Sequence, residues 1–165
     1  MKRISKKSLI LVGLALAGLS FLIYNYSQQA NQKLANAPQI AQESSLDADG
    51  KTVKSIFEQT LKASNEKNAA AYVSYLVPKA RKNTEAQLAA SFKEQDITNT
   101  LLSFRVLKEK DGHLLAEAKV KSINNTNNQK NYRDNIATID VSYVKQQGKW
   151  LIDLTTTIDT QLLNK

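Results

Sequence analysis

The stretch VSYVKQQGKWLIDLTTTI, residues 141–158, alternates apolar and polar side chains on both sides of a short polar turn that contains Gly148. An alternation of period two on either side of a glycine-containing turn predicts the two strands of a β-hairpin. The only tryptophan of the chain, Trp150, lies just after that turn, at the start of the last predicted strand. The stretch therefore predicts that the chain ends in an antiparallel sheet. The same-face residues are expected to be Ile139, Val141 and Tyr143 in the first strand, and Trp150, Ile152, Leu154 and Thr156 in the second.

A second hairpin is predicted upstream of this one. The segments TLLSFRVLKEK and HLLAEAKVKSI flank Asp111-Gly112, a dipeptide that strongly favours a two-residue hairpin turn. Alternate residues from Leu114 to Val120 are apolar, so one face of that strand is expected to be buried. After the polar loop NNTNNQKN, we expect a third strand from about Tyr132 to Lys145 and a fourth from Lys149 to about Ile158. These strands form a predicted antiparallel meander.

Before the strands, the apolar residues recur with the period of a helix. A first helix carries an apolar stripe from Val53 to Leu61, and a second, shorter helix is capped by Asn68 and is expected to stop at Pro78. A third helix is expected to follow Thr84, with Gln87 completing a capping box. Helices followed by a meander predict an α+β domain in which three helices pack on one side of a four-stranded antiparallel sheet.

The N-terminus has the pattern of a membrane anchor. Four cationic residues lie within positions 1–7, and no charge follows until Lys33. Residues 8–26 are apolar enough to form a helix that crosses about 30 Å of hydrocarbon, and the charge bias places the N-terminus in the cytoplasm. The predicted organisation is a cytoplasmic tail at 1–7, a transmembrane signal anchor at 8–26, a linker at 27–50 and an extracytoplasmic domain at 51–165.

A cleaved secretory signal is the alternative interpretation of the same residues. Its best cleavage site would be ANA at residues 35–37, which lies far from the apolar run and is followed by Pro38. An uncleaved anchor is therefore favoured. Gly13 and Ala17 form a small-xxx-small pair that would allow two anchor helices to approach closely, so a homo-oligomer is one expectation.

Composition argues against several classes of function. The net charge is +8, but half of the excess lies in the first seven residues, so no nucleic acid partner is expected. The chain has no cysteine, which excludes disulfides and thiolate catalysis. Its single histidine, His113, follows the Asp-Gly turn, and no paired-carboxylate spacing is present, so no catalytic residue, metal or cofactor is predicted. Asp140 and Asp153 are expected on the exposed face of the sheet, opposite lysines.

The order of these elements resembles the nuclear transport factor 2-like superfamily. The resemblance is carried by the paired helices, by NEKNAAAYVSYLV and by the closing VSYVKQQGKWLIDL, and it covers residues 51–158. It implies a strongly curved sheet that wraps the first helix into a cone. In that arrangement Trp150 would begin the last strand on the concave side and fill the space between sheet and helices.

The whole architecture is also similar to the bitopic scaffold subunit of type IV secretion and conjugation machines. That resemblance implies a non-catalytic scaffold on the extracytoplasmic face of the cell membrane, held by residues 8–26, whose partners are other envelope proteins. The chain departs from it in its short tail and in lacking a subunit-specific motif. The expected interaction surface is Lys62, Lys79, Arg81, Lys82 and Lys93.

A binding module is the second hypothesis, from a different class. Here the cone would hold a small apolar ligand, a lipid tail or a peptide from the cell envelope. The expected cavity lining is Phe57, Tyr72, Leu76, Phe92 and Trp150.

Overall fold

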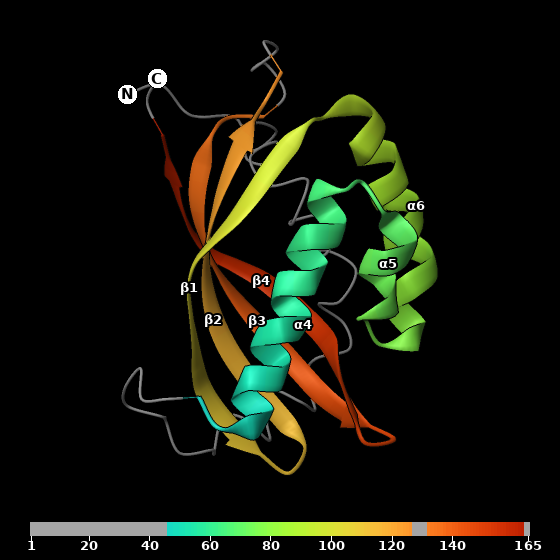
Figure 1. The fold of residues 1–165 in the computed structure, drawn as a ribbon, viewed down its shortest axis with the longest axis vertical. Coiled ribbons are helices and arrows are strands. Elements are labelled where there is room, and N and C mark those ends of the chain that lie inside the picture. Colours follow the sequence, from blue (N-terminus) through green and yellow to red (C-terminus); the bar gives the residue numbers. More distant parts are fainter. Residues whose placement is uncertain (1–45, 127–131, 164–165) are drawn as a thin grey trace, which may run out of the picture.

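The computed structural model describes residues 46–126 and 132–163. In this part of the chain three helices precede four strands, and the strands form one antiparallel sheet in the order β1-β2-β3-β4. The predicted α+β fold is therefore confirmed (Figure 1). The elements are α4 (Ala48–Asn65), α5 (Ala69–Ser74), α6 (Pro78–Glu94), β1 (Ile97–Lys110), β2 (His113–Asn124), β3 (Asn135–Gln146) and β4 (Lys149–Leu162).

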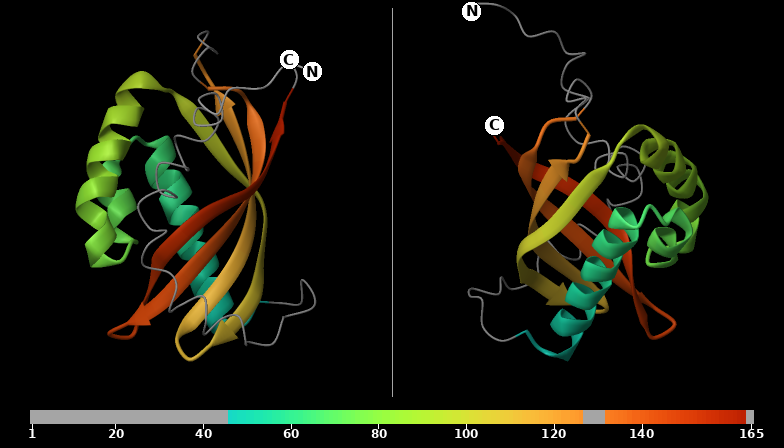
Figure 2. Two further views of the ribbon diagram at one scale, coloured as in Figure 1. Left: turned by 180° about the vertical axis from the view of Figure 1, so that it is seen from behind. Right: turned by 45° about the horizontal axis from the view of Figure 1, so that its top comes forward.

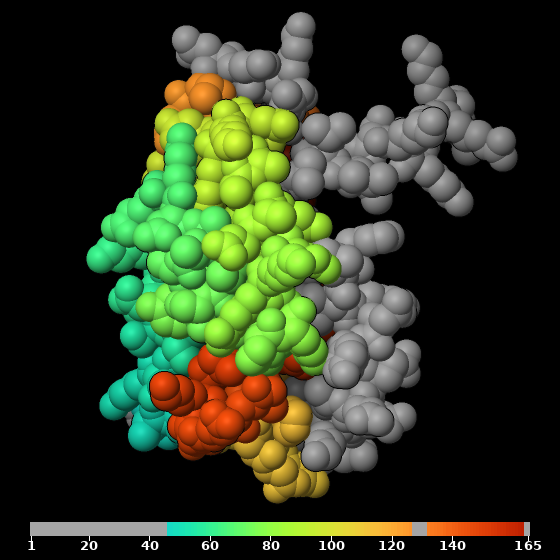
Figure 3. Space-filling view, turned by 90° about the vertical axis from the view of Figure 1, so that its right-hand side faces the viewer, coloured from blue at the N-terminus to red at the C-terminus, as the bar shows by residue number. Residues whose placement is uncertain are grey.

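The sheet is strongly twisted and wraps around α4, which lies along its concave side (Figures 1 and 2). Register shifts interrupt the β1–β2 pairing at two places and the β3–β4 pairing at two more. Such bulges bend a strand and increase its right-handed twist, so they account for the curvature of the sheet. The helices α5 and α6 then cover the flank of α4 beside β4, as Figure 3 shows from that side.

The core lies between α4 and the sheet. Val53 and Phe57 of α4 are almost fully buried, and the facing residues Ala116 and Ala118 of β2 are fully buried. Alanines at these positions leave room for the helix. The rings of Phe57 and Phe104 lie 6.0 Å apart between centroids with an interplanar angle of 41°, a tilted arrangement that aromatic pairs favour.

Both predicted hairpin turns are confirmed by their backbone conformation. Asp111 and Gly112 have φ values of 51° and 73°, and Gln147 and Gly148 have φ values of 50° and 77°. Two successive positive φ values define a type I′ turn, whose twist matches that of the flanking strands. The glycine is needed at the second position because other residues rarely adopt this conformation.

The predicted helix boundaries around Pro78 were wrong. Pro78 does not stop a helix but begins α6, where its missing N–H would have no helical partner in any case. The preceding residues instead bridge to β4: the Ile152 N–H donates to the Tyr75 carbonyl at 2.9 Å and the Val77 N–H to the Ile152 carbonyl at 3.0 Å. Thr84 is a buried residue inside α6, so the capping box predicted there does not exist.

The prediction of which β4 residues point toward the core was correct only in the first half of the strand. Trp150 and Ile152 are buried, but the register shifts between the pairs Ser142–Leu154 and Tyr143–Ile152, which leaves Asp153 as an extra residue. This bulge changes which residues point inward. Thr155 is therefore 4% exposed while Leu154 is half-buried and Thr156 is exposed, and the strand continues beyond Ile158 to Leu162.

Within residues 46–126 and 132–163, no helix is both long and apolar enough to cross a membrane. The predicted anchor at residues 8–26 and most of the predicted linker lie outside the described residues.

Candidate functional site

The five residues expected to line a cavity come together in one apolar cluster. Phe57, Tyr72, Leu76 and Trp150 are all at most 5% exposed, and Phe92 is partly buried against them. They come from four different elements and from the segment between α5 and α6. Burial raises the pKa of the Tyr72 hydroxyl well above its usual range. That these side chains line a ligand site stays a prediction.

Trp150 is held by a polar contact that the sequence did not predict. Its Nε1–H donates to Oδ1 of Asp49 at 2.8 Å, and the Lys145 Nζ lies 3.3 Å from both oxygens of the same carboxylate. The Lys145 ammonium also lies 5.3 Å from the centroid of the Trp150 ring, within the range of a cation–π interaction. The hydrogen bond from Trp150, and then Lys145, lower the pKa of Asp49. We call these three residues the Asp49 cluster; it joins the first turn of α4 to the β3–β4 hairpin.

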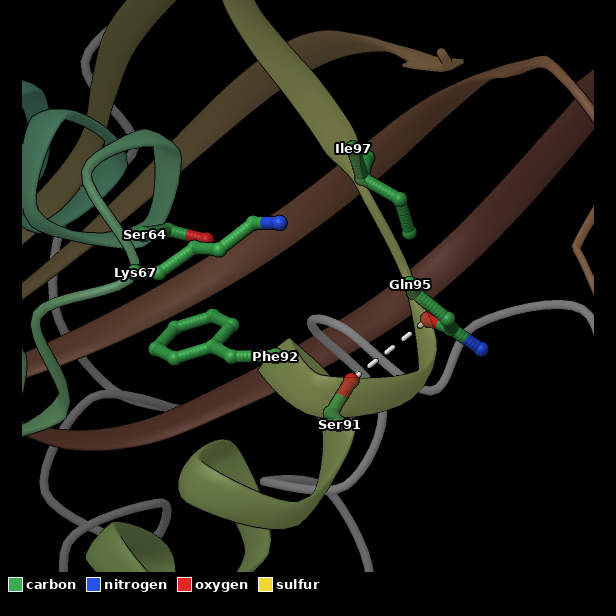
Figure 4. Close-up of a pocket in the computed structure, with 6 residues that line it drawn as sticks. All are labelled: Ser64, Lys67, Ser91, Phe92, Gln95 and Ile97. Carbon is green, nitrogen blue, oxygen red and sulfur yellow. Dashed lines mark hydrogen bonds between the residues drawn. The ribbon is translucent and has the colours of Figure 1, made fainter. Parts of the chain in front are cut away.

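A small pocket lies between the C-terminal ends of α4 and α6 and the start of β1 (Figure 4). Its volume is about 10 Å³, room for roughly one water molecule. The Ser91 hydroxyl donates to Gln95 Oε1 at 3.4 Å beside it, and the Lys67 Nζ forms a 3.0 Å ion pair with Asp96. This pocket is too small for a metabolite. It is lined by Ser64, Lys67, Ser91, Phe92, Gln95 and Ile97.

Next to this pocket a buried amide network ties α4 to the sheet. The Asn65 side chain donates to the Asn99 carbonyl at 2.9 Å and accepts from the Asn99 N–H at 2.8 Å. The Ser122 hydroxyl donates to the side chain of Asn99 at 2.7 Å. Because Asn99 is only 4% exposed, these partners satisfy polar groups that water cannot reach. The network is structural, and no sequence spacing indicates it.

The structure does not gather the predicted cationic surface into one patch. Lys79 and Arg81 lie in the first turn of α6 and Lys93 in its last turn, about 20 Å away along a helix. The Arg81 guanidinium donates to the carbonyl of Leu76 at 3.0 Å and to that of Ser74 at 3.4 Å. Its side chain therefore satisfies backbone acceptors at and just after the end of α5. Within the described part of the chain, Lys82 and Lys93 have no ion pair, and Lys62 pairs with Glu66 at 3.9 Å on the surface of α4.

The expectation that Asp153 lies on the exposed face was wrong. Asp153 is 8% exposed, and its carboxylate forms a 3.1 Å ion pair with Lys79 of α6. The bulge at this position turns the side chain toward the helix instead of away from it. The pair thus connects α6 to β4 beside the bridge formed by Ile152.

Asp140 does lie on the sheet face opposite to α4, but it faces a carboxylate and not a lysine. The register places it opposite Glu117 of β2, which accepts a 2.8 Å hydrogen bond from Arg105 of β1. Oδ1 of Asp140 is buried and has no hydrogen-bond partner in the described part of the chain. Burial and then the charge of Glu117 raise the pKa of Asp140, and Arg105 opposes this. Two carboxylates are thus paired across strands, which a search for paired spacings along the sequence could not detect.

Replacing Asp140 with asparagine is expected to raise the free energy of unfolding at pH 7 by roughly 0.5–1 kcal/mol, because the half-buried charge and its repulsion from Glu117 are removed. The raised pKa means that Asp140 stabilises the fold below its usual pKa of 3.8, and that this contribution is lost as the pH rises through the folded-state pKa. The advantage of the variant should therefore grow with pH. Urea unfolding of residues 46–165 at pH 3.5 and 7 measures it.

Glu85→Gln is the matched control, because Glu85 is an exposed carboxylate on α6. The interpretation fails if Asp140→Asn is no more stable than the wild type at pH 7, or if its advantage is larger at pH 3.5. Either result would mean that the Asp140 carboxylate is solvated or has an attractive partner.

In the part of the chain that the structure describes, the remaining titratable side chains are not grouped into one centre. His113 begins β2 directly after the Asp-Gly turn, as predicted. Within the residues that the structure describes, no three histidine or acidic side chains are grouped as metal ligands would be. The carboxylate pair of Glu117 and Asp140 lies on the sheet face opposite to α4.

A family model for the C-terminal domain of the anti-sigma-I factor RsgI9 matches residues 55–163. The chain belongs to this family. The matched range runs from within α4 to the residue after β4, so it covers nearly all of the folded part. Among curated proteins, none matches the chain significantly.

Solved structures show the fold of this RsgI9-type domain. An uncharacterised protein with a cystatin-like fold from Caulobacter vibrioides superimposes with a TM-score of 0.59 at 13% identity, over 68% of this chain and 92% of that one. A protein described as NTF2-like, of unknown function, from Pseudomonas putida KT2440 superimposes with a TM-score of 0.57 at 11% identity, over 68% and 88%. Identities this low show the fold alone. The two superpositions confirm the expected nuclear transport factor 2-like architecture.

Proposed function

We propose that this chain is a non-catalytic, membrane-anchored domain that binds other proteins on the extracytoplasmic side of the cell membrane. The observation that carries the proposal is the match of residues 55–163 to a domain of an anti-sigma-I factor. An anti-sigma factor is named for its action on another protein, so binding of a protein partner is the corresponding role here.

The sequence before the domain supports the tethered arrangement. Residues 8–26 have the length and apolar character of a membrane span, and the cationic residues before them favour an N-terminus in the cytoplasm. The linker leads directly into α4, whose first turn is joined to the β3–β4 hairpin through Asp49 and Trp150. Binding at the domain would therefore occur near the membrane, within the length of the linker.

The finer hypotheses remain predictions. Membership of a conjugation or type IV secretion complex would be supported by a chromosomal neighbourhood of conjugation ATPases. The alternative of an apolar ligand in the cone depends on Phe57, Tyr72, Leu76, Phe92 and Trp150 leaving open space. Their place in the core cluster supports a packing role instead.

The anchored topology predicts that protease added to intact cells digests the domain and leaves an N-terminal fragment in the membrane. A cytoplasmic protein in the same cells should remain intact. As a matched variant, exchanging the four cationic residues at positions 2–7 for glutamate should protect part of the domain, because the charge bias sets the orientation. A domain that is fully protected in the unaltered chain, or a secreted form that begins near Pro38, would contradict the topology.

A further inference from the structure

The strand β4 is an edge of the sheet, and the described residues cover its outer side only at its beginning. It pairs with β3 on one side. On the other side, the described residues meet it in one bridge, between Leu76 and Ile152. From Leu154 to Leu162 the strand has no described neighbour on its outer edge, so its outward backbone N–H and C=O groups can accept another strand.

Apart from a bulge at Ile158 and one charge, this open section lacks the features that normally protect an edge strand. The residues from Leu154 to Leu162, LTTTIDTQL, contain a single charge, Asp159, and no lysine, arginine, proline or glycine. Threonine and isoleucine favour the extended conformation. Ile158 is the extra residue of a second bulge and is 52% exposed. The opposite edge, β1, is different, since it carries several charged residues, among them Arg105 and Lys108.

We propose that the β4 edge binds the β4 edge of a second copy of this chain, antiparallel and centred on Ile158. In this register Thr156 faces Thr160 of the second copy, and Leu154 faces Leu162. Asp159 faces Thr157, so no like charges stand directly opposite each other. A parallel arrangement would place the two Asp159 carboxylates side by side, which is unfavourable.

The pairing of β4 with β4 is also favoured because it gives a closed dimer. A β4–β4 contact is the same surface on both copies, so it ends in a dimer with one sheet running through both domains. A β4–β1 contact would leave a free edge on each side and would continue into a filament. The pairing does not require the anchor. Confinement in a membrane would nevertheless raise the local concentration and strengthen a weak contact.

Engineered cysteines test the pairing directly, because the chain has no cysteine of its own. In the full-length chain, Ile158→Cys should give a disulfide-linked dimer under mild oxidation, since paired antiparallel residues have Cα atoms about 4.5–5.5 Å apart, within disulfide reach. Leu102→Cys is the matched control, an apolar residue of β1 that is 49% exposed. It should give little dimer.

The register is tested by mixing two variants that pair only with each other. Co-expressed Thr156→Cys and Thr160→Cys chains should crosslink, whereas each alone should not, because its two copies of the cysteine would lie about 13 Å apart along the strands. Ile158→Lys added to both should reduce the crosslinked fraction several-fold by placing like charges opposite each other. Leu102→Lys should leave it unchanged.

Three results would overturn the proposal. Leu102→Cys could crosslink as readily as Ile158→Cys, which would indicate random collision. Thr156→Cys alone could crosslink as strongly as the mixture, which would exclude the register. Ile158→Cys could form adducts only with a protein of another mass, which would assign the edge to a different partner. None of these results bears on the anchored topology, which the protease experiment tests separately.

Discussion

Replacing Trp150 with alanine is expected to lower the free energy of unfolding by about 3–5 kcal/mol, the usual cost of deleting a large buried aromatic side chain. The side chain is 5% exposed and belongs to the main core cluster. Domains of this size have a total stability of about 5–15 kcal/mol, so the variant should be close to unfolding under mild conditions. Urea unfolding of residues 46–165 followed by circular dichroism measures the loss without depending on tryptophan fluorescence.

Two variants separate the volume of Trp150 from its hydrogen bond. Trp150→Phe keeps most of the ring but removes the donor to Asp49, so a smaller loss is expected. Tyr143→Phe is the control for a core aromatic, because Tyr143 is fully buried and its hydroxyl has no partner in the described residues. Removing that hydroxyl should be neutral or slightly stabilising. A loss below about 1 kcal/mol for Trp150→Ala would show that the residue is not a core side chain.

The burial of Trp150 could be predicted from the sequence, but its polar partner could not. An alternating pattern around Gly148 is local, and it places the tryptophan on the inward face of the last strand. Asp49 lies far away in the sequence, at the start of α4, where an acidic residue is also explained by the helix dipole alone. Nothing in the chain indicates which of its carboxylates meets the indole.

The hairpin turns could be predicted from the sequence, whereas the bulge in β4 could not. Gly112 and Gly148 are required by positive φ values at the second turn position, so these glycines mark the turns. The bulge at Asp153 has no such requirement and follows from how β3 and β4 pair over the curved core. The predicted alternation of period two takes no account of that bulge. It therefore placed Thr156 on the buried face of the sheet, whereas the structure exposes it.

An interaction surface is the hardest feature to predict from the sequence, and the predicted cationic surface stays a prediction. Protein-binding surfaces need no fixed residue types at fixed spacings, whereas a catalytic centre does. Counting cations on helices grouped Arg81 with Lys82, although Arg81 donates to backbone carbonyls at the end of α5. The section of β4 from Leu154 to Leu162, which has a single charge, could be recognised as an edge only when the sheet order showed which strands have one neighbour.

Replacing Lys79 with methionine is expected to lower the free energy of unfolding by about 2–3 kcal/mol, because it leaves the buried Asp153 carboxylate without its cation. Asp153 is 8% exposed, so water can replace little of the lost interaction. The opposite change, Asp153→Asn, should cost only about 1 kcal/mol, since the Lys79 side chain is 40% exposed and can be solvated. The cost should therefore be asymmetric, although the same ion pair is broken in both variants.

The double variant Lys79→Met with Asp153→Leu tests the reason for that asymmetry. With both charges removed, no unpaired carboxylate remains, so the double variant should be more stable than Lys79→Met alone. Lys82→Met is the matched control, because Lys82 lies in the same helix, is exposed and has no ion pair in the described residues. It should change stability by less than about 0.5 kcal/mol. If Asp153→Asn costs as much as Lys79→Met, the asymmetry is absent, and the cost does not arise from leaving the Asp153 carboxylate unpaired.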